Sequence, residues 1–166
     1  PHVWVSVSLA IQQVRNIANA LEEVDPEHAD FYRRNADAYI VRLDALRKKM
    51  LAGLKDVKNR NIVTLHEAFP YFAREFGLRV VAVVEREPGS EPSARELAQT
   101  IDLVSQSGSA VLFAEPQYPT KAIDVIAAET GAKVYILDPA VTGPMQANAY
   151  LQIMERNLVA LEEALK

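Results

Sequence analysis

Apolar positions divide the chain into a helical first part and a mixed second part. Through residues 1–56 they recur every three or four residues, the spacing of one face of an amphipathic helix. Ser6 or Ser8 can cap a first helix, and Asp25–Glu27 ends it and starts a second one, which ends at Gly53. At about 1.5 Å per residue the second helix is about 40 Å long. This length suits a strut that extends beyond one lobe, and an ordinary long surface helix is the alternative. The two apolar stripes consist of Val7, Ala10, Ile11, Val14, Ile17, Ala18 and Leu21, and of Tyr32, Asn35, Tyr39, Leu43, Leu46 and Met50.

From Asn59 onward, short apolar runs alternate with helical segments. These runs do not alternate with polar residues, as expected of parallel strands that are covered on both faces. Four strand–helix units in succession predict an α/β fold: a four-stranded parallel sheet with flanking helices, preceded by the long strut helix. We therefore expect a helical segment over residues 1–56 and an α/β lobe over residues 57–166. The expected strand–helix pairs are 62–65 with 67–76, 80–84 with 93–107, 110–114 with 120–130, and 133–137 with 145–165.

Composition excludes several classes of protein. The 166 residues include no cysteine, which excludes a disulfide framework, a thiolate zinc site and a cysteine nucleophile. The formal net charge of −4 and the charged fraction of 24% argue against a nucleic-acid partner held by phosphate contacts. Hydrophobic residues make up 49% of the chain, too many for a disordered protein. No apolar run reaches the ~18 residues that a membrane span needs.

A polar side chain follows each expected strand, and each of these side chains can bind a metal or transfer a proton. They are His66, Glu85, Glu115 and Asp138, which parallel strands bring to one edge of the sheet. Exposed strand ends are often polar, so chance is the alternative explanation. The sequence has no nucleophile-elbow, His-Glu-x-x-His or glycine-rich phosphate motif. Metal ligation by imidazole and carboxylate is the chemistry that remains, and spacing alone leaves open whether His66 is a ligand or a structural residue.

Several short segments carry motifs that occur together in one known family. They are Pro1–Trp4 (family pattern Asp-Pro-His-x-Trp), Thr64–Ala73 (T-x-H-[DE]-A-F-x-Y-[FL]-A), Phe76–Leu78, Ser90–Ser93 (E-P-S), Phe113–Gln117 (F-x-E-P-Q) and Leu137–Pro139 (L-D-P). In order and approximate spacing, over essentially the whole chain, they resemble the cluster A-I (zinc/manganese, ZnuA- and TroA-like) substrate-binding proteins of ABC transporters.

The resemblance implies a two-lobed protein with one long joining helix and a metal between the lobes. This chain would be that helix and the carboxy-terminal lobe, without the amino-terminal lobe and its histidine ligand. Matched position by position, His2, His66 and Asp138 are metal ligands and Glu115 lies beside the metal. Glu67 would cap the following helix or orient a ligand. Histidine at position 66 favours Zn²⁺, with Mn²⁺ as the alternative, because nitrogen ligands bind zinc better than manganese.

The function that the resemblance implies is non-enzymatic capture of a metal ion outside the cytoplasm and its delivery to an ABC permease. The protein would be periplasmic or a cell-surface lipoprotein, touching the membrane only through the permease or through a lipid anchor outside this chain. A metal-dependent adhesion or interaction module is one alternative. A hydrolase of flavodoxin-like topology that uses Glu85, Glu115 and Asp138 as acid/base groups is another. With one lobe missing, we expect weak or absent metal binding and self-association through exposed apolar surface.

Overall fold

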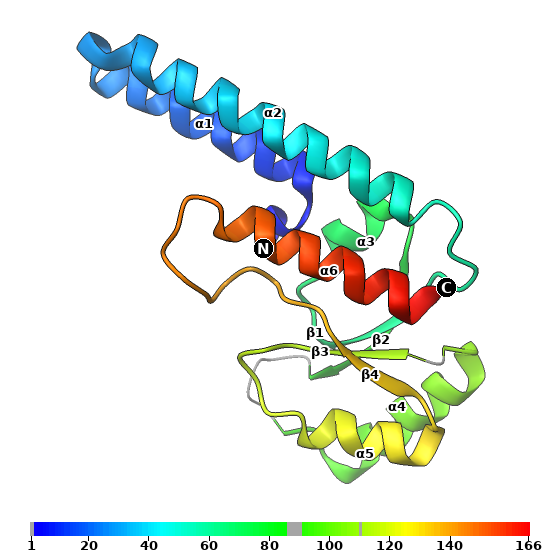
Figure 1. Cartoon of the computed structure of the whole chain (residues 1–166). Coiled ribbons are helices and arrows are strands. Elements are labelled where there is room, and N and C mark those ends of the chain that lie inside the picture. Colours follow the sequence, from blue (N-terminus) through cyan, green and yellow to red (C-terminus); the bar gives the residue numbers. More distant parts are fainter. Residues whose placement is uncertain (1, 86–90, 110) are drawn as a thin grey trace.

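A computed structural model describes residues 2–85, 91–109 and 111–166 (Figure 1). Its helices are η1 (Val3–Val5), α1 (Val7–Val24), η2 (Pro26–His28), α2 (Ala29–Gly53), α3 (Pro70–Phe76), α4 (Ala94–Ser107), α5 (Lys121–Thr130) and α6 (Ala149–Leu165). Its strands are β1 (Asn61–His66), β2 (Arg79–Glu85), β3 (Val111–Ala114) and β4 (Lys133–Ile136). The predicted α/β class and the order of its elements are confirmed.

Helices α1 and α2 form a hairpin whose outer half projects beyond the rest of the molecule (Figure 1). Ser6 caps α1 as predicted, because its hydroxyl accepts a hydrogen bond from the backbone N–H of Leu9. Helix α2 has 25 residues and is about 37 Å long. Its buried residues, Leu43, Leu46 and Met50, all lie in its second half. In the first half only partly buried residues, among them Tyr39 and Ile40 near its end, pack against the core.

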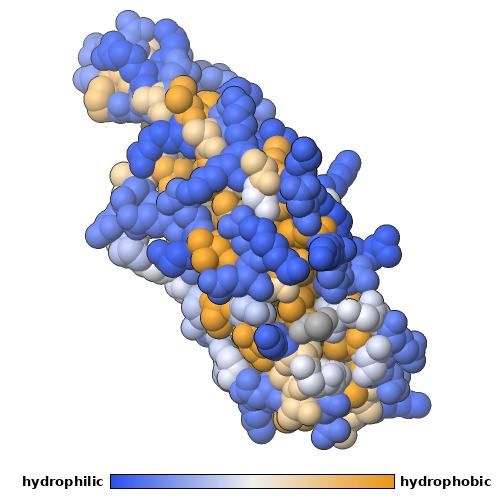
Figure 2. Space-filling view, turned by 45° about the vertical axis from the view of Figure 1, so that its right-hand side comes forward, coloured by the Kyte–Doolittle hydropathy of each residue, from blue (hydrophilic) through white to orange (hydrophobic). Residues whose placement is uncertain are grey.

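Apolar side chains remain exposed along the outer half of this hairpin, between the charged ones (Figure 2). Val24 at its tip is 78% exposed and Val41 on α2 is 69% exposed. Such surface favours association, and self-association stays a prediction. None of the helices in the described ranges combines the length and apolar character required to cross a membrane.

The four strands form one sheet in the order β2-β1-β3-β4, and every neighbouring pair is parallel. Strands β1 and β3 are central and almost completely buried, as their apolar sequences predict. Strands β2 and β4 are the edges, and parts of them are exposed. All four carboxyl ends therefore point to the same edge of the sheet, where the polar residues were predicted to gather.

Helices cover both faces of the sheet and enclose two apolar layers. On one face α4 and α5 pack against alternate strand residues such as Leu112. On the other face α3, α6 and the base of the hairpin pack against the intervening residues, with Phe113, Met50 and Leu158 in one cluster (Figure 1). The second layer joins the hairpin to the lobe, because residues of α2 and α6 belong to the same core.

Two predicted helices begin later than expected. The helix predicted from Glu67 begins at Pro70, because residues 67 and 68 form a tight turn in which the N–H of Ala68 donates to the carbonyl of His66. Glu67 is exposed and is not the cap of α3, whose N-cap is Phe69, so the capping role predicted for Glu67 is wrong.

The last helix was predicted to begin at Met145 and begins at Ala149, since turns occupy the residues just after Pro144. Three positions used in the predictions, Pro1, Ser90 and Ala110, lie outside the described residues.

Candidate metal centre

The candidate site lies where the chain changes direction across the sheet. After β1 the chain continues to the neighbouring edge strand β2, and it then returns past β1 to form β3 on the other side. The crevice outside the carboxyl ends of β1 and β3 is therefore the topological switch point, the usual ligand position in open α/β sheets. His66 is the last residue of β1, and Glu115 directly follows β3. The two adjacent central strands thus deliver an imidazole and a carboxylate to the same place.

His66 and Glu115 form a buried pair at this crevice. His66 Nδ1 lies 2.5 Å from Glu115 Oε1, and the backbone N–H of His66 donates to the same oxygen at 3.2 Å. The side-chain amide of Gln117 donates to the other carboxylate oxygen, Oε2, at 2.9 Å. Both oxygens of Glu115 are therefore engaged. The pairing holds the imidazole ring by its Nδ1 side, so that its Nε2 atom is left to face a ligand.

His2 faces His66 from the start of the chain. The Nε2 atoms of the two imidazoles are 3.4 Å apart, and the ring centroids are 5.1 Å apart with the planes nearly perpendicular. Two nitrogen ligands of a tetrahedral Zn²⁺, each ~2.0–2.1 Å from the ion, are separated by about 3.3 Å. The ring of Tyr118 lies on another side of His66, at a centroid distance of 5.4 Å. The spacing of the two Nε2 atoms therefore matches that of a pair of zinc ligands.

Burial changes the proton affinities of all three groups. It lowers the pKa of His2 and of His66 from the ordinary value of 6.5, and the charge of His66 lowers that of His2 further. Both shifts favour the neutral imidazole, the form that binds metal. Burial raises the pKa of Glu115 to about 7, although the bonds from His66 and Gln117 oppose this increase. The metal-free pair is therefore balanced between protonated and ionised carboxylate near neutral pH.

Asp138 follows β4 at the same edge of the sheet. Its carboxylate oxygen Oδ1 accepts a hydrogen bond from the N–H of Ala140 at 2.8 Å. Ala140 has a left-handed backbone with φ of 57°. The amide of Asn157, a buried residue of α6, accepts from the Asp138 N–H at 2.9 Å and donates to the Asp138 carbonyl at 2.8 Å. The backbone of Asp138 is thus fixed by α6, while its carboxylate is used within its own turn.

The structure brings His2 and His66 together, but within the ranges it describes no three His, Asp or Glu side chains are grouped so that they could hold one ion. Asp138 acts on Glu115 through its charge, as Glu85 does. That the Asp138 carboxylate is a ligand therefore stays a prediction. Glu115 lies beside His66, at the position predicted for it, and its place next to a metal is likewise still a prediction.

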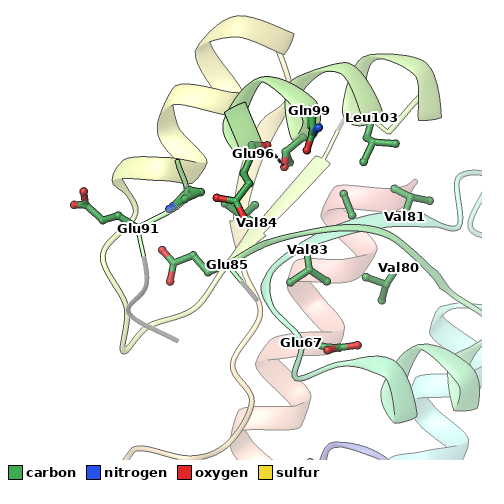
Figure 3. A pocket seen from close by; sticks show the side chains of 13 residues that line it. Glu67, Val80, Val81, Val83, Val84, Glu85, Glu91, Glu96, Gln99 and Leu103 are labelled. Atoms are coloured by element: carbon green, nitrogen blue, oxygen red, sulfur yellow. Dashed lines mark hydrogen bonds between the residues drawn. The ribbon is translucent and has the colours of Figure 1, made fainter. Parts of the chain in front are cut away.

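A separate groove lies along the open edge of β2 (Figure 3). It has a volume of about 690 Å³ and runs between the turn at Glu67 and helix α4. Val80 and Val83 point toward the side of Glu67, whereas Val81 and Val84 point toward α4 (Figure 3). No histidine lines it. The groove is therefore a separate feature from the pair of imidazoles.

Sequence reasoning missed three residues that shape the site. Gln117 and Tyr118 follow Glu115 and contact the pair, and only Gln117 was part of a recognised segment. Asn157 lies on the buried face of α6, between Met154 and Leu158. A polar residue at a position where the helical period predicts an apolar one is a detectable signal, because buried amides need specific partners.

Known proteins are similar to this chain in sequence and in fold. A family model described as "Zinc-uptake complex component A periplasmic" (ZnuA) matches residues 1–164. The high-affinity zinc uptake system protein ZnuA of Bacillus subtilis strain 168 is 32% identical over 169 residues, which cover 99% of this chain and 53% of that protein. The chain therefore spans about half the length of this curated relative.

Two solved structures extend the comparison. The structure of the substrate-binding protein FpvC from Pseudomonas aeruginosa in complex with Mn²⁺ has a TM-score of 0.91 and 40% identity, over 99% of this chain and 60% of that one. The laminin-binding protein Lmb of Streptococcus agalactiae, described as bifunctional with adhesin and metal transporting activity, has a TM-score of 0.90 and 34% identity. That match covers 100% of this chain and 65% of the other. The four-stranded parallel sheet with its flanking helices is the fold of these metal-binding proteins.

Proposed function

Since the chain belongs to the ZnuA family of zinc-uptake periplasmic binding proteins, we propose that it captures Zn²⁺ outside the cytoplasm for an ABC importer. In this proposal the ion is cargo, held by Nε2 of His2 and Nε2 of His66 and then released to a permease. Mn²⁺ is the second candidate, because the similar FpvC structure holds that ion. The protein is then a solute-binding protein and not an enzyme.

One observation carries the proposal: the Nε2 atoms of His2 and His66 are 3.4 Å apart. This is the separation expected of two nitrogen ligands on one tetrahedral zinc ion. The Nδ1 atom of His66 is already occupied by Glu115, which fixes the ring with Nε2 toward His2. Two neutral nitrogen ligands favour Zn²⁺ over Mn²⁺ in the ordinary order of affinities.

We assign the carboxylate of Asp138 as a third ligand, which would leave its bond to Ala140 when the ion arrives. Its charge already acts on Glu115, and its backbone is held firmly by Asn157, both of which support a role near the pair. A further histidine from a lobe outside these 166 residues completes the site in this proposal. It follows that residues 1–166 alone bind zinc less tightly than a protein with both lobes.

One of the three groups of the hydrolase alternative, Glu115, is not free to act as a base. A general base needs an oxygen or nitrogen that is free to take a proton from a substrate or water. Both oxygens of Glu115 are engaged, by His66 and by Gln117. The adhesion alternative has one specific support, the similarity to Lmb with its printed adhesin activity. We therefore retain adhesion as the second candidate and set hydrolysis aside.

Calorimetric zinc titration of the two-lobed protein that contains these residues, and of three single variants of it, tests the proposal. The His2→Ala and His66→Ala variants each lose one proposed ligand. The matched control is His28→Ala, since His28 lies at the hairpin tip and contacts Asp25. We expect one zinc ion per chain, strongly weakened binding in the first two variants, and unchanged binding in the control. Equal affinity in His66→Ala and wild type would overturn the assignment, and metal-independent binding to laminin by His66→Ala would favour adhesion.

A further inference from the structure

Trp4 joins two segments that are far apart in the sequence and that both carry proposed ligands. Its indole Nε1–H donates a hydrogen bond to the carbonyl oxygen of Pro139 at 2.7 Å. The carbonyl oxygen of Trp4 itself accepts a hydrogen bond from the hydroxyl of Tyr150 on α6, also at 2.7 Å. The residue two positions after His2 is thus tied at its side chain to the residue after Asp138, and at its backbone to helix α6.

The two imidazoles of the site are held by different means. The Nδ1 atom of His66 is bonded to Glu115, which sets the orientation of that ring. The Nδ1 atom of His2 is buried and has no hydrogen-bond partner among the described residues. The His2 ring instead lies between two other rings, with centroids 5.3 Å from Trp4 and 5.1 Å from His66. Packing against the indole therefore does for His2 what a hydrogen bond does for His66.

The frame to which Trp4 is attached is rigid. Asn157 binds both the N–H and the carbonyl of Asp138, next to the Pro139 carbonyl that accepts the indole bond. Tyr150 belongs to the first turn of α6, and Asn157 lies further along the same helix. Trp4 thus links the segment of His2 to α6, the same helix that holds the Asp138 turn.

We propose that Trp4 is a positioning residue for metal capture: it sets the His2 ring against His66 and fixes that segment to the turn that carries Asp138. The inference rests on the proposed function, because it concerns the geometry of the same site. Trp4 does not touch the ion. It reduces the range of orientations that His2 samples before binding, and ordering a ligand in advance strengthens binding.

A double-mutant cycle between Trp4→Phe and His2→Ala tests the proposal. Phenylalanine keeps an aromatic ring and removes the donor to Pro139. Loss of one such bond corresponds to roughly a 2- to 10-fold decrease in zinc affinity. We expect this decrease when His2 is present and no further decrease in the His2→Ala background. Equal decreases in both backgrounds mean a purely structural role and overturn the proposal, as does an unchanged affinity in Trp4→Phe.

Two further measurements keep the test decisive. Tyr150→Phe removes the hydroxyl bonded to the Trp4 carbonyl with little change in shape, so it repeats the test if Trp4→Phe folds poorly. Its thermal unfolding shows whether the variant is folded at the temperature of the titration. In the metal-free protein, we expect proton–proton NOEs between the His2 and His66 rings in wild type and much weaker ones in Trp4→Phe. Strong NOEs in both proteins overturn the positioning role. Lack of zinc binding in the two-lobed wild-type protein, with NOEs lost in Trp4→Phe, would refute the proposed function and support the positioning of His2.

Discussion

Replacing Glu115 by glutamine removes the charge that His66 is paired with and leaves the shape of the side chain almost unchanged. Glu115 is 1% exposed, and one of its oxygens accepts from both the side chain and the backbone of His66. A glutamine carbonyl could still accept these bonds. Its amide nitrogen would then face the amide nitrogen of Gln117, which donates to the second oxygen in the wild type. The variant therefore loses the negative charge beside His66, and it leaves the side-chain amide of Gln117 without its acceptor.

The expected effect on zinc affinity is large enough to measure easily. Removing a carboxylate that supports a metal-bound histidine lowers metal affinity about 10- to 100-fold, which is about 1.4–2.8 kcal/mol at 1.4 kcal/mol per tenfold change. The net value of a hydrogen bond to a charged group, about 1.5–3 kcal/mol, leads to the same range. At pH 8, Glu115→Gln should thus bind zinc about 10- to 100-fold more weakly than wild type.

The difference in zinc affinity between wild type and Glu115→Gln should also change with pH, which provides a second test. Zinc on Nε2 of His66 requires a proton on Nδ1 and an ionised Glu115 to accept it. Because burial raises the pKa of Glu115 to about 7, zinc binding below that pH must release the carboxyl proton, so wild-type affinity falls as pH decreases from about 7. Glutamine carries no such proton, and burial lowers the pKa of His66 and of His2 from 6.5, which favours their neutral, metal-binding form. The difference between variant and wild type should therefore shrink as pH falls.

Competition titrations against a zinc chelator at pH 8, 7 and 6 measure this difference directly. Without metal, the free energy of unfolding checks the pKa itself. The folded protein retains the Glu115 proton between the ordinary pKa of 4.5 and about 7, so this group's contribution to stability decreases as pH rises through that window. Urea unfolding of Glu115→Gln should lack this decrease. The reasoning is refuted if wild type and variant bind zinc equally at pH 8, or if the two affinities fall in parallel with pH.

Three further predictions concern the frame of the site. Asn157→Leu removes both hydrogen bonds to the partly buried backbone of Asp138, and urea unfolding should show a loss of about 1–3 kcal/mol in total. A loss below about 0.5 kcal/mol would contradict the role of Asn157. Leu43→Ala, at a fully buried position of α2, should destabilise the protein by about 2–5 kcal/mol. Val41→Ala, on the exposed side of the same helix, should change the free energy of unfolding by less than about 0.5 kcal/mol, and similar values for both variants would argue against the described packing of α2. Gly77 ends α3 in a left-handed conformation with φ of 68°. Alanine is strained there by about 1–2 kcal/mol, so Gly77→Ala should unfold at a lower temperature than wild type, and an unchanged midpoint of thermal unfolding would count against this cap.

Most of the fold could be predicted from the sequence, because in most elements the local residue pattern agrees with the burial that the structure shows. Continuous apolar runs in β1 and β3 predicted strands covered on both faces, and the hairpin was marked by Ser6 and by the Asp25–Glu27 turn. The errors are at helix starts. Glu67 looks like a helix cap by residue type, but Pro70 fixes the first turn and the intervening residues form a turn of their own.

The site could be predicted only in part, since its contacts join residues that are distant in the chain. Strand ends predicted that His66 and Glu115 share an edge, yet their direct bond depends on β1 and β3 being neighbours, which the order of strands along the chain does not reveal. The approach of His2 to His66 spans 64 positions and came from the family resemblance alone. Neither the hydrophobic pattern nor the motifs predicted the hydrogen bond from Trp4 to Pro139, which are 135 positions apart.

The charges and bonds of the crevice favour capture of an ion over chemical transformation of a substrate. Three side chains near the two Nε2 atoms hold another group: Glu115 holds His66, Gln117 holds Glu115, and Asp138 caps its own turn. This arrangement supports the proposed role, in which an ion is bound and released without being changed. Reversible binding is what delivery to a second protein requires, since cargo held too tightly would never leave.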